Sequence, residues 1–133
     1  ERLRFDARIR SELKPPQCLP AVAQGAIAIE VREGDQRITD LCAVLNHHDT
    51  ALRVRAERAM NRALHGSCQV PIAGFAELQG EVMSLQALVG DAESGELIRA
   101  EASGPSADAE ALGLSVAAKL RDSGVDRLLA RHR

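Results

Sequence analysis

Cys68 is the residue of this 133-residue sequence whose surroundings point most directly to chemistry. It lies in His65–Pro71 (HGSCQVP), between the end of a predicted helix and the start of a predicted strand. Such connections are exposed, and the small neighbours Gly66 and Ser67 would let a bulky group approach the backbone. The C-terminal end of a helix carries negative partial charge, which does not favour a thiolate. The pattern therefore indicates a covalent attachment point rather than a strongly activated nucleophile.

The other cysteines and the histidines have simpler interpretations. Cys18 and Cys42 are expected to be buried structural thiols, and the irregular spacing of the cysteines predicts neither disulfides nor a metal site. The adjacent His47 and His48 project in different directions, so we expect them at the surface or at a helix cap. His65 precedes Cys68 by three residues, but the sequence places no carboxylate to orient it for catalysis.

Three arginines, Arg55, Arg58 and Arg62, recur at the spacing of one helical face. Such a cluster could bind an anion. Because Glu57 is interleaved with the arginines, we expect a solvated face instead.

The overall composition excludes several classes of protein. A net charge of −2 gives no bulk attraction to nucleic acid or to an anionic membrane, and two phenylalanines as the whole aromatic content leave no stacking platform for bases. No apolar run approaches the roughly 20 residues of a membrane-spanning helix. Neither GxGxxG nor a Walker motif is present. An odd number of cysteines, without a signal-peptide core at the N-terminus, predicts a cytoplasmic protein.

From residue 49 onward the pattern predicts a self-contained α+β unit. Asp49 or Thr50 is expected to cap a helix that Gly66 closes. Three consecutive antiparallel strands follow, at Val70–Leu78, Val82–Val89 and Glu96–Ala102. A last helix opens at Gly104-Pro105-Ser106, with an apolar stripe at Ala109, Leu112, Val116 and Leu120. Gly124 ends this helix, and Leu128-Leu129 adds a final turn. Both helices are expected on the apolar face of the sheet.

The sequence of the N-terminal third predicts a helix and a strand whose packing partners this chain does not supply. Phe5, Ile9 and Leu13 form one helical stripe that Pro15-Pro16 ends, and the helix has no cap ahead of it, which indicates a truncation. Leu19–Val31 is almost continuously apolar and is typical of a strand buried on both faces. A short amphipathic helix is expected around Ile38–Leu45.

The order and spacing of several motifs closely resemble the porphobilinogen deaminase (hydroxymethylbilane synthase) family across essentially the whole chain. The motifs are LPAVAQGA at residues 19–26, IEVR at 29–32, the segment from Thr50 to AER at 56–58, and GSCQVPI at 66–72. The family usually has glycine where Ala23 and Ser67 stand here.

The resemblance implies a chain made of the C-terminal part of a three-domain enzyme. Residues 1–19 would end the second domain and residues 20–25 would form a hinge. Residues 26–47 would return to the first domain, and residues 48–133 would form the third. The first two domains of the family are periplasmic-binding-protein-like α/β domains, of which this chain would retain remnants, and the third is a three-stranded antiparallel sheet with helices.

The resemblance also implies a transferase of tetrapyrrole and heme biosynthesis. Family members polymerise four porphobilinogen units head to tail into hydroxymethylbilane and release ammonia at each step, on a dipyrromethane cofactor held by a thioether. The attachment residue corresponds to Cys68. Gln24 and Gly25 would lie near the cofactor, and Arg2 and Arg32 would bind the carboxylate arms of the substrate. The catalytic acid and most substrate arginines lie in the N-terminal part of the family, so the chain by itself is expected to be inactive.

The implied partners are porphobilinogen, the growing polypyrrole chain and the missing N-terminal domains, in a monomer without nucleic acid or membrane. Two alternatives stay open. A non-catalytic ligand-binding or regulatory α+β module predicts an unmodified Cys68. A thiol redox protein predicts reversible oxidation with a resolving thiol nearby, which the sequence does not place.

Overall fold

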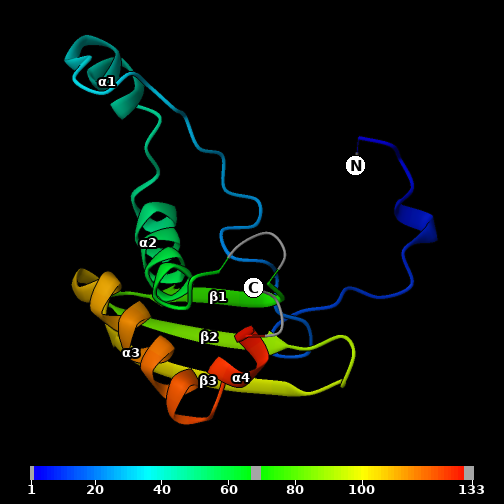
Figure 1. The fold of residues 1–133 in the computed structure, drawn as a ribbon. Coiled ribbons are helices and arrows are strands. Elements are labelled where there is room, and N and C mark those ends of the chain that lie inside the picture. The colour runs from blue at the N-terminus through cyan, green and yellow to red at the C-terminus, as the bar shows by residue number, and fades with distance from the viewer. Residues whose placement is uncertain (1, 67–69, 131–133) are drawn as a thin grey trace.

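The computed structural model describes residues 2–66 and 70–130, and its core is a three-stranded antiparallel sheet with two helices packed on one face (Figure 1). The strands are β1 (Ile72–Gln79), β2 (Val82–Gly90) and β3 (Leu97–Pro105), in the order β1-β2-β3. The covering helices are α2 (His48–Ala63) and α3 (Ala109–Asp122). The shorter elements are α1 (Gln36–Ala43), α4 (Asp126–Leu129) and 3₁₀ turns at Asp6–Arg8 and Ser106–Asp108. The α+β architecture predicted for the C-terminal part is therefore confirmed.

Alternation along the central strand decides which face the helices cover. Every second side chain of β2 is buried, namely Met83, Leu85, Ala87 and Val89. In the observed register Ile72 of β1 and Ile98 of β3 both pair with Val89, so the three side chains lie on the same face. This face packs against the predicted stripe of α3, all of which is buried. The burial of these aliphatic side chains, each about 1.5–3 kcal/mol when complete, holds the helices on the sheet.

The two covering helices meet closely at Gly113 of α3. A Cβ added there would fall on the carbonyl oxygen of Ala56, and would lie 2.8 Å from the Cβ of Ala59 and 3.0 Å from the backbone nitrogen of Met60. Only a residue without a side chain permits this approach of α3 to the backbone of α2.

The ends of α2 differ from the prediction by one to three residues. The N-cap is His47, whose Nδ1 accepts from the backbone N–H of Thr50 at 3.3 Å, so the cap expected at Asp49 or Thr50 is wrong. At the other end, the left-handed residue is His65 (φ 54°) and not Gly66. The amides of His65 and Gly66 donate to the carbonyls of Arg62 (3.0 Å) and Asn61 (2.9 Å), which satisfies the last turn.

The predicted start of α3 at Gly104-Pro105-Ser106 is wrong, because Gly104 and Pro105 continue β3 and a 3₁₀ turn precedes the helix, which begins at Ala109. The end of α3 is as predicted. Gly124 adopts φ 83°, and its amide donates to the carbonyl of Arg121 at 2.8 Å. The final turn, α4, follows directly, and its Leu128 and Leu129 are buried in the core. Arg127 of α4 also pairs with Glu96 next to β3, so the C-terminal turn is joined to the sheet by both apolar and charged contacts.

The helix predicted for residues 1–14 is wrong. The structure has a single 3₁₀ turn there, with the Arg8 guanidinium 4.7 Å from the centre of the Phe5 ring. Phe5, Ile9 and Leu13 are all exposed. A short helix is marginal in water unless its apolar stripe packs against something, and no described residue covers this stripe.

The buried strand predicted for Leu19–Val31 is also wrong. Ala21 forms one isolated antiparallel bridge with Ala73, and residues 26–31 are irregular, with Ile27 94% exposed. A strand needs a partner for its backbone groups, and residues 26–31 pair with none of the described strands. The predicted helix around Ile38–Leu45 is confirmed as α1, capped by Asp35. Remnants of two α/β domains are not seen as such in residues 2–47.

Within the described ranges 2–66 and 70–130, no helix is long and apolar enough to cross a membrane.

Candidate functional site

Cys68 lies outside the described residues, but the structure describes the chain on either side of it. The segment leaves α2 through His65 and Gly66, whose amides are held by carbonyls of the last helical turn. It re-enters the described chain at Val70, which packs against the core, and the carbonyl of Pro71 accepts from Gly90 at 3.0 Å. The predicted position of the segment, between a helix end and a strand start, is confirmed by these flanks.

The Pro20–Gly25 segment, predicted as a hinge, lies along the outer edge of β1 (Figure 1). Ala21 bridges Ala73, and the amide of Gly74 donates to the carbonyl of Pro20 at 3.1 Å. Val22 packs against the core next to Gly74, where an added Cβ would lie 3.4 Å from Val22 Cγ2 and 2.9 Å from Met60 Cε. The absence of a side chain at Gly74 therefore makes room for this segment.

Gln24 and Gly25, predicted near a cofactor, form a tight double turn. The Gln24 side-chain Oε1 accepts from the amide of Ala21 at 3.0 Å, and the Gln24 amide donates to the carbonyl of Ala21 at the same distance. Gly25 has φ 83° with no atom within 4 Å of a would-be Cβ, so glycine is needed there for backbone conformation and not for space. Ala23 is also left-handed, with φ 59°, in a region that costs an L-residue about 1–2 kcal/mol.

Glu57 of α2 is the group that joins this turn to the sheet. Its Oε2 accepts from the amide of Ala23 at 2.7 Å and its Oε1 accepts from the amide of Ala76 at 2.9 Å. The residue is only 6% exposed. Burial raises the pKa of Glu57 above its usual value, while the two amide bonds and the nearby positive charge of Arg53 oppose that rise.

A hollow of about 240 Å³ opens between the turn and α2. Its polar lining comes from Gln24, Thr50, Arg53 and Glu57, and small residues of the 20–26 segment make up much of the rest. A second, more apolar hollow is lined by Ala21 together with Val70 and Pro71. The hinge thus lies beside the C-terminal flank of the connection that contains Cys68.

Sequence reasoning missed Glu57, which it placed in a solvated face with the neighbouring arginines. The signal was present in the helical periodicity, because Glu57 directly follows Ala56 and precedes Met60 by three residues, and both of these are buried. A carboxylate at the border of a buried stripe requires donors. These donors come from segments far away in the sequence, so periodicity alone does not reveal them.

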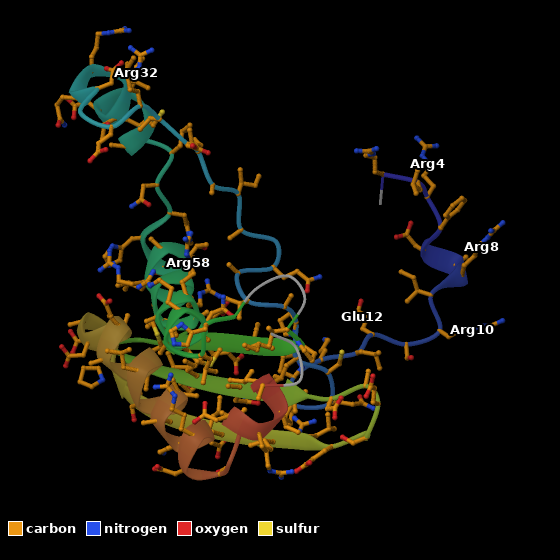
Figure 2. The ribbon with its side chains drawn as sticks, viewed as in Figure 1. Arg4, Arg8, Arg10, Glu12, Arg32 and Arg58 are labelled. Atoms are coloured by element: carbon orange, nitrogen blue, oxygen red, sulfur yellow. The ribbon has the colours of Figure 1, made fainter. Side chains whose placement is uncertain are left out.

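The predicted arginines are not brought to this site. Arg32 is exposed and lies next to α1, well away from the sheet, as Figure 2 shows. Arg2 is exposed on the N-terminal segment, ahead of the 3₁₀ turn. The structure therefore does not place Arg2 or Arg32 near Gln24 and Gly25.

The solvated arginine face on α2 is confirmed. Arg55, Arg58 and Arg62 are all exposed, and Figure 2 shows Arg58 on α2. Arg62 contacts Glu110 of α3 at 3.4 Å in an exposed ion pair.

The cysteine and histidine predictions had mixed outcomes. Cys18 is exposed, so its interpretation as a buried thiol is wrong, and Cys42 is half-buried. His47 is the helix cap and His48 is exposed, as expected. His65 is exposed and is the residue after α2 that adopts the left-handed backbone conformation.

Comparisons with known proteins point to one family for both parts of the chain. A family model described as "Porphobilinogen deaminase, C-terminal domain" matches residues 51–122, which covers the sheet and its two helices. A second, described as "Porphobilinogen deaminase, dipyromethane cofactor binding domain", matches residues 1–40.

Curated relatives match almost the entire chain. A porphobilinogen deaminase from Xanthomonas axonopodis pv. citri is 53% identical over 130 residues, which is 98% of this chain and 43% of the relative. One from Stenotrophomonas maltophilia is 53% identical over 129 residues, again 43% of that protein. The chain therefore spans less than half the length of these relatives.

Proposed function

This chain belongs to the porphobilinogen deaminase family, and we propose that it supplies the C-terminal part of a hydroxymethylbilane synthase. The observation that carries the proposal is the 53% identity along 98% of the chain, which includes the GSCQVPI segment. The reaction would join four porphobilinogen units head to tail with release of ammonia at each step.

We propose that Cys68 holds the dipyrromethane cofactor through a thioether. Two features support the proposal: the small residues Gly66 and Ser67 precede Cys68 in the sequence, and the hollow beside the hinge is lined by Arg53 and Gln24, which could bind carboxylate arms. When bound, the cofactor would supply the free pyrrole position from which the product grows. Because the thiol would react once and then serve as an anchor, it needs no strong activation.

The roles of this chain's other residues would be binding and positioning. Gln24 and Gly25 shape the turn beside the cofactor, and Arg2 and Arg32 would bind substrate carboxylates once the remaining domains bring them to the cleft. Protonation of the leaving amine would fall to a carboxylate in the N-terminal part of the family, as the resemblance implies. Glu57, the acidic group that lines the described hinge hollow, already accepts backbone amides with both oxygens. The arginines would neutralise negative charge and orient the reacting units.

The proposed domain division assigns residues 1–19 to the end of a second domain, 20–25 to the hinge, 26–47 to a segment of the first domain and 48–133 to the third. The two family models agree with the last of these boundaries alone, because one ends at residue 40 and the other begins at residue 51. The enzyme would be a cytoplasmic monomer whose partners are porphobilinogen and the growing chain.

The test is an intact-mass measurement on the complete natural protein, with and without Cys68→Ala. We expect the unmodified sequence to carry the mass of a dipyrromethane, and Cys68→Ala to lose both the adduct and the consumption of porphobilinogen. Cys18→Ala is the matched control, because Cys18 is an exposed thiol elsewhere in the chain and should leave adduct and turnover unchanged. An active Cys68→Ala protein without an adduct would rule the proposal out.

A further inference from the structure

We propose that Glu57 is a positioning residue that fastens the Pro20–Gly25 hinge to the outer edge of β1, and thereby fixes the hinge relative to the connection that contains Cys68. The catalytic consequence rests on the proposed function. The fastening itself rests on contacts between described residues.

The edge of β1 offers backbone donors that no neighbouring strand takes. β1 pairs with β2 on one side, and the amides of Gly74 and Ala76 are satisfied on the other. Gly74 donates to the carbonyl of Pro20 at 3.1 Å, and Ala76 donates to Glu57 Oε1 at 2.9 Å. Beyond the point where the hinge turns away from β1, the Glu57 carboxylate accepts the next outward-facing amide of the strand, that of Ala76.

The second oxygen of Glu57 holds the hinge itself. Ala23 donates to Oε2 at 2.7 Å, although it precedes α2 by more than twenty residues. Ala23 is left-handed at φ 59°, a conformation that a non-glycine residue keeps only when its surroundings impose it. Glu57 is 6% exposed, so water cannot readily replace either bond. The carboxylate is therefore well placed to impose this conformation.

The same helix connects this contact to the attachment segment. Glu57 lies in α2, which ends at Ala63 and continues through His65 and Gly66 into the residues before Cys68. Val22 of the hinge packs on the core beside Gly74, and Ala21 shares a hollow with Val70 and Pro71. Residues 20–22 keep these contacts without Glu57, so its loss would free the Ala23–Gly25 turn, the part of the hinge that leaves the edge of β1.

Because the two hydrogen bonds of Glu57 join different segments, a positioning role can be distinguished from a structural role by experiment. The bond from Ala76 joins α2 to the sheet within one unit, whereas the bond from Ala23 joins that unit to the hinge. A purely structural Glu57 would affect the stability of the α2–sheet unit alone. A positioning Glu57 affects the hinge and the turnover of correctly folded molecules.

The experiment uses Glu57→Gln in the complete natural protein, with Glu77→Gln as the matched control on the exposed side of β1. An amide side chain can accept only one of the two backbone donors. We expect hydrogen exchange at the Ala23 amide to be about tenfold faster and kcat per folded molecule to fall about tenfold, with KM nearly unchanged. Glu77→Gln should leave all three quantities at the wild-type values.

Ala23→Val is a second variant that leaves the α2–sheet unit intact. A β-branched residue strongly disfavours φ 59°, so this change should loosen the hinge and lower kcat while exchange at Ala76 stays slow. Unchanged exchange at both the Ala23 and the Ala76 amides in Glu57→Gln, or unchanged kcat in Ala23→Val, would overturn the proposal. A wild-type protein that does not consume porphobilinogen would contradict the proposed function instead, and the exchange measurements would still decide the role of Glu57.

Discussion

Glu57 and Asp91 are the two acidic side chains that are buried among residues 2–66 and 70–130. Asp91 lies in the turn between β2 and β3, where its carboxylate oxygens accept from the Glu93 amide and the Ser94 hydroxyl. Glu57 instead joins three segments of the chain and carries a pKa raised chiefly by burial. We therefore expect Glu57 to change how the free energy of unfolding depends on pH.

We predict that Glu57 makes the folded domain lose stability as the pH rises. Its pKa is higher in the folded state than the ordinary value of 4.5, so the folded protein holds the proton more tightly than the unfolded chain. The resulting stabilisation is complete below pH 4.5 and is lost as the pH rises through the folded-state pKa. Glu57→Gln should remove this contribution and flatten the profile, as measured by the urea midpoint from pH 4.5 upward.

The control for this profile is Glu77→Gln, which changes an exposed carboxylate on the neighbouring strand and should keep the wild-type slope. If the urea midpoint of Glu57→Gln changes with pH as steeply as that of the wild type, then the pKa of Glu57 is the same in the folded and unfolded states.

Residue types predicted the candidate site only in part. Cys68 was found from its small neighbours and its place between two elements, and those elements are where they were expected. Glu57 was missed because its donors, Ala23 and Ala76, are backbone amides that have no signature in the sequence. The proposed roles of Arg2 and Arg32 come from the family resemblance, since the structure leaves both exposed and Figure 2 shows Arg32 next to α1, away from the sheet.

At the scale of elements, the contact between α2 and α3 depends on a residue without a side chain. Gly113→Ala would gain about 1 kcal/mol of helix propensity but would place a methyl group on the Ala56 carbonyl. Overpacking usually costs about 1–3 kcal/mol, and a clash with backbone should cost at least the upper end of that range, so we predict a net loss of about 2 kcal/mol or more in the free energy of unfolding. Urea denaturation followed by circular dichroism measures this change.

Gly104→Ala provides the matched comparison. A Cβ at Gly104 would meet only the Leu112 Cδ1, at an ordinary 4.0 Å, so this variant should lose much less stability than Gly113→Ala. Equal stability of the two variants would show that α2 and α3 can separate without cost.

Periodicity predicted β2 and the buried stripe of α3, and it failed for the stripe of residues 1–14. α1 forms as predicted although Leu41 and Leu45 of the predicted helix are exposed. β2 was placed within one residue and the buried stripe and the end of α3 were placed correctly, because their apolar positions face one another across a single core. The stripe at Phe5, Ile9 and Leu13 has the same helical spacing but no surface to cover. An apolar pattern therefore indicates which side chains should be buried, but it does not by itself settle whether the element forms.

At the scale of the whole molecule, we predict that residues 1–133 alone do not make hydroxymethylbilane. The reaction needs an acid at the leaving amine, a group of arginines around the carboxylates and a cleft that excludes water. In the described residues Glu57 is occupied by two amides, and Arg32 lies far from the hinge. The measurement is incubation with porphobilinogen, followed by assays of ammonia release and of uroporphyrin absorbance after acid oxidation.

The positive control for this assay is the complete Xanthomonas axonopodis relative under the same conditions. Turnover by residues 1–133 at a comparable rate would place the catalytic acid within this chain and would refute the allocation of roles.

The attachment of the hinge to β1 also bears on self-association. An outer strand with free backbone groups is a template on which another chain can add a strand and begin to aggregate. Here Pro20, Ala21 and Glu57 occupy the outer side of β1. At the opposite side of the sheet, Lys119 of α3 donates to the carbonyl of Glu101 in β3 at 2.8 Å and adds a positive charge there. The outer side of β1 is thus shielded along part of its length, and a hinge that detaches would expose it to intermolecular pairing.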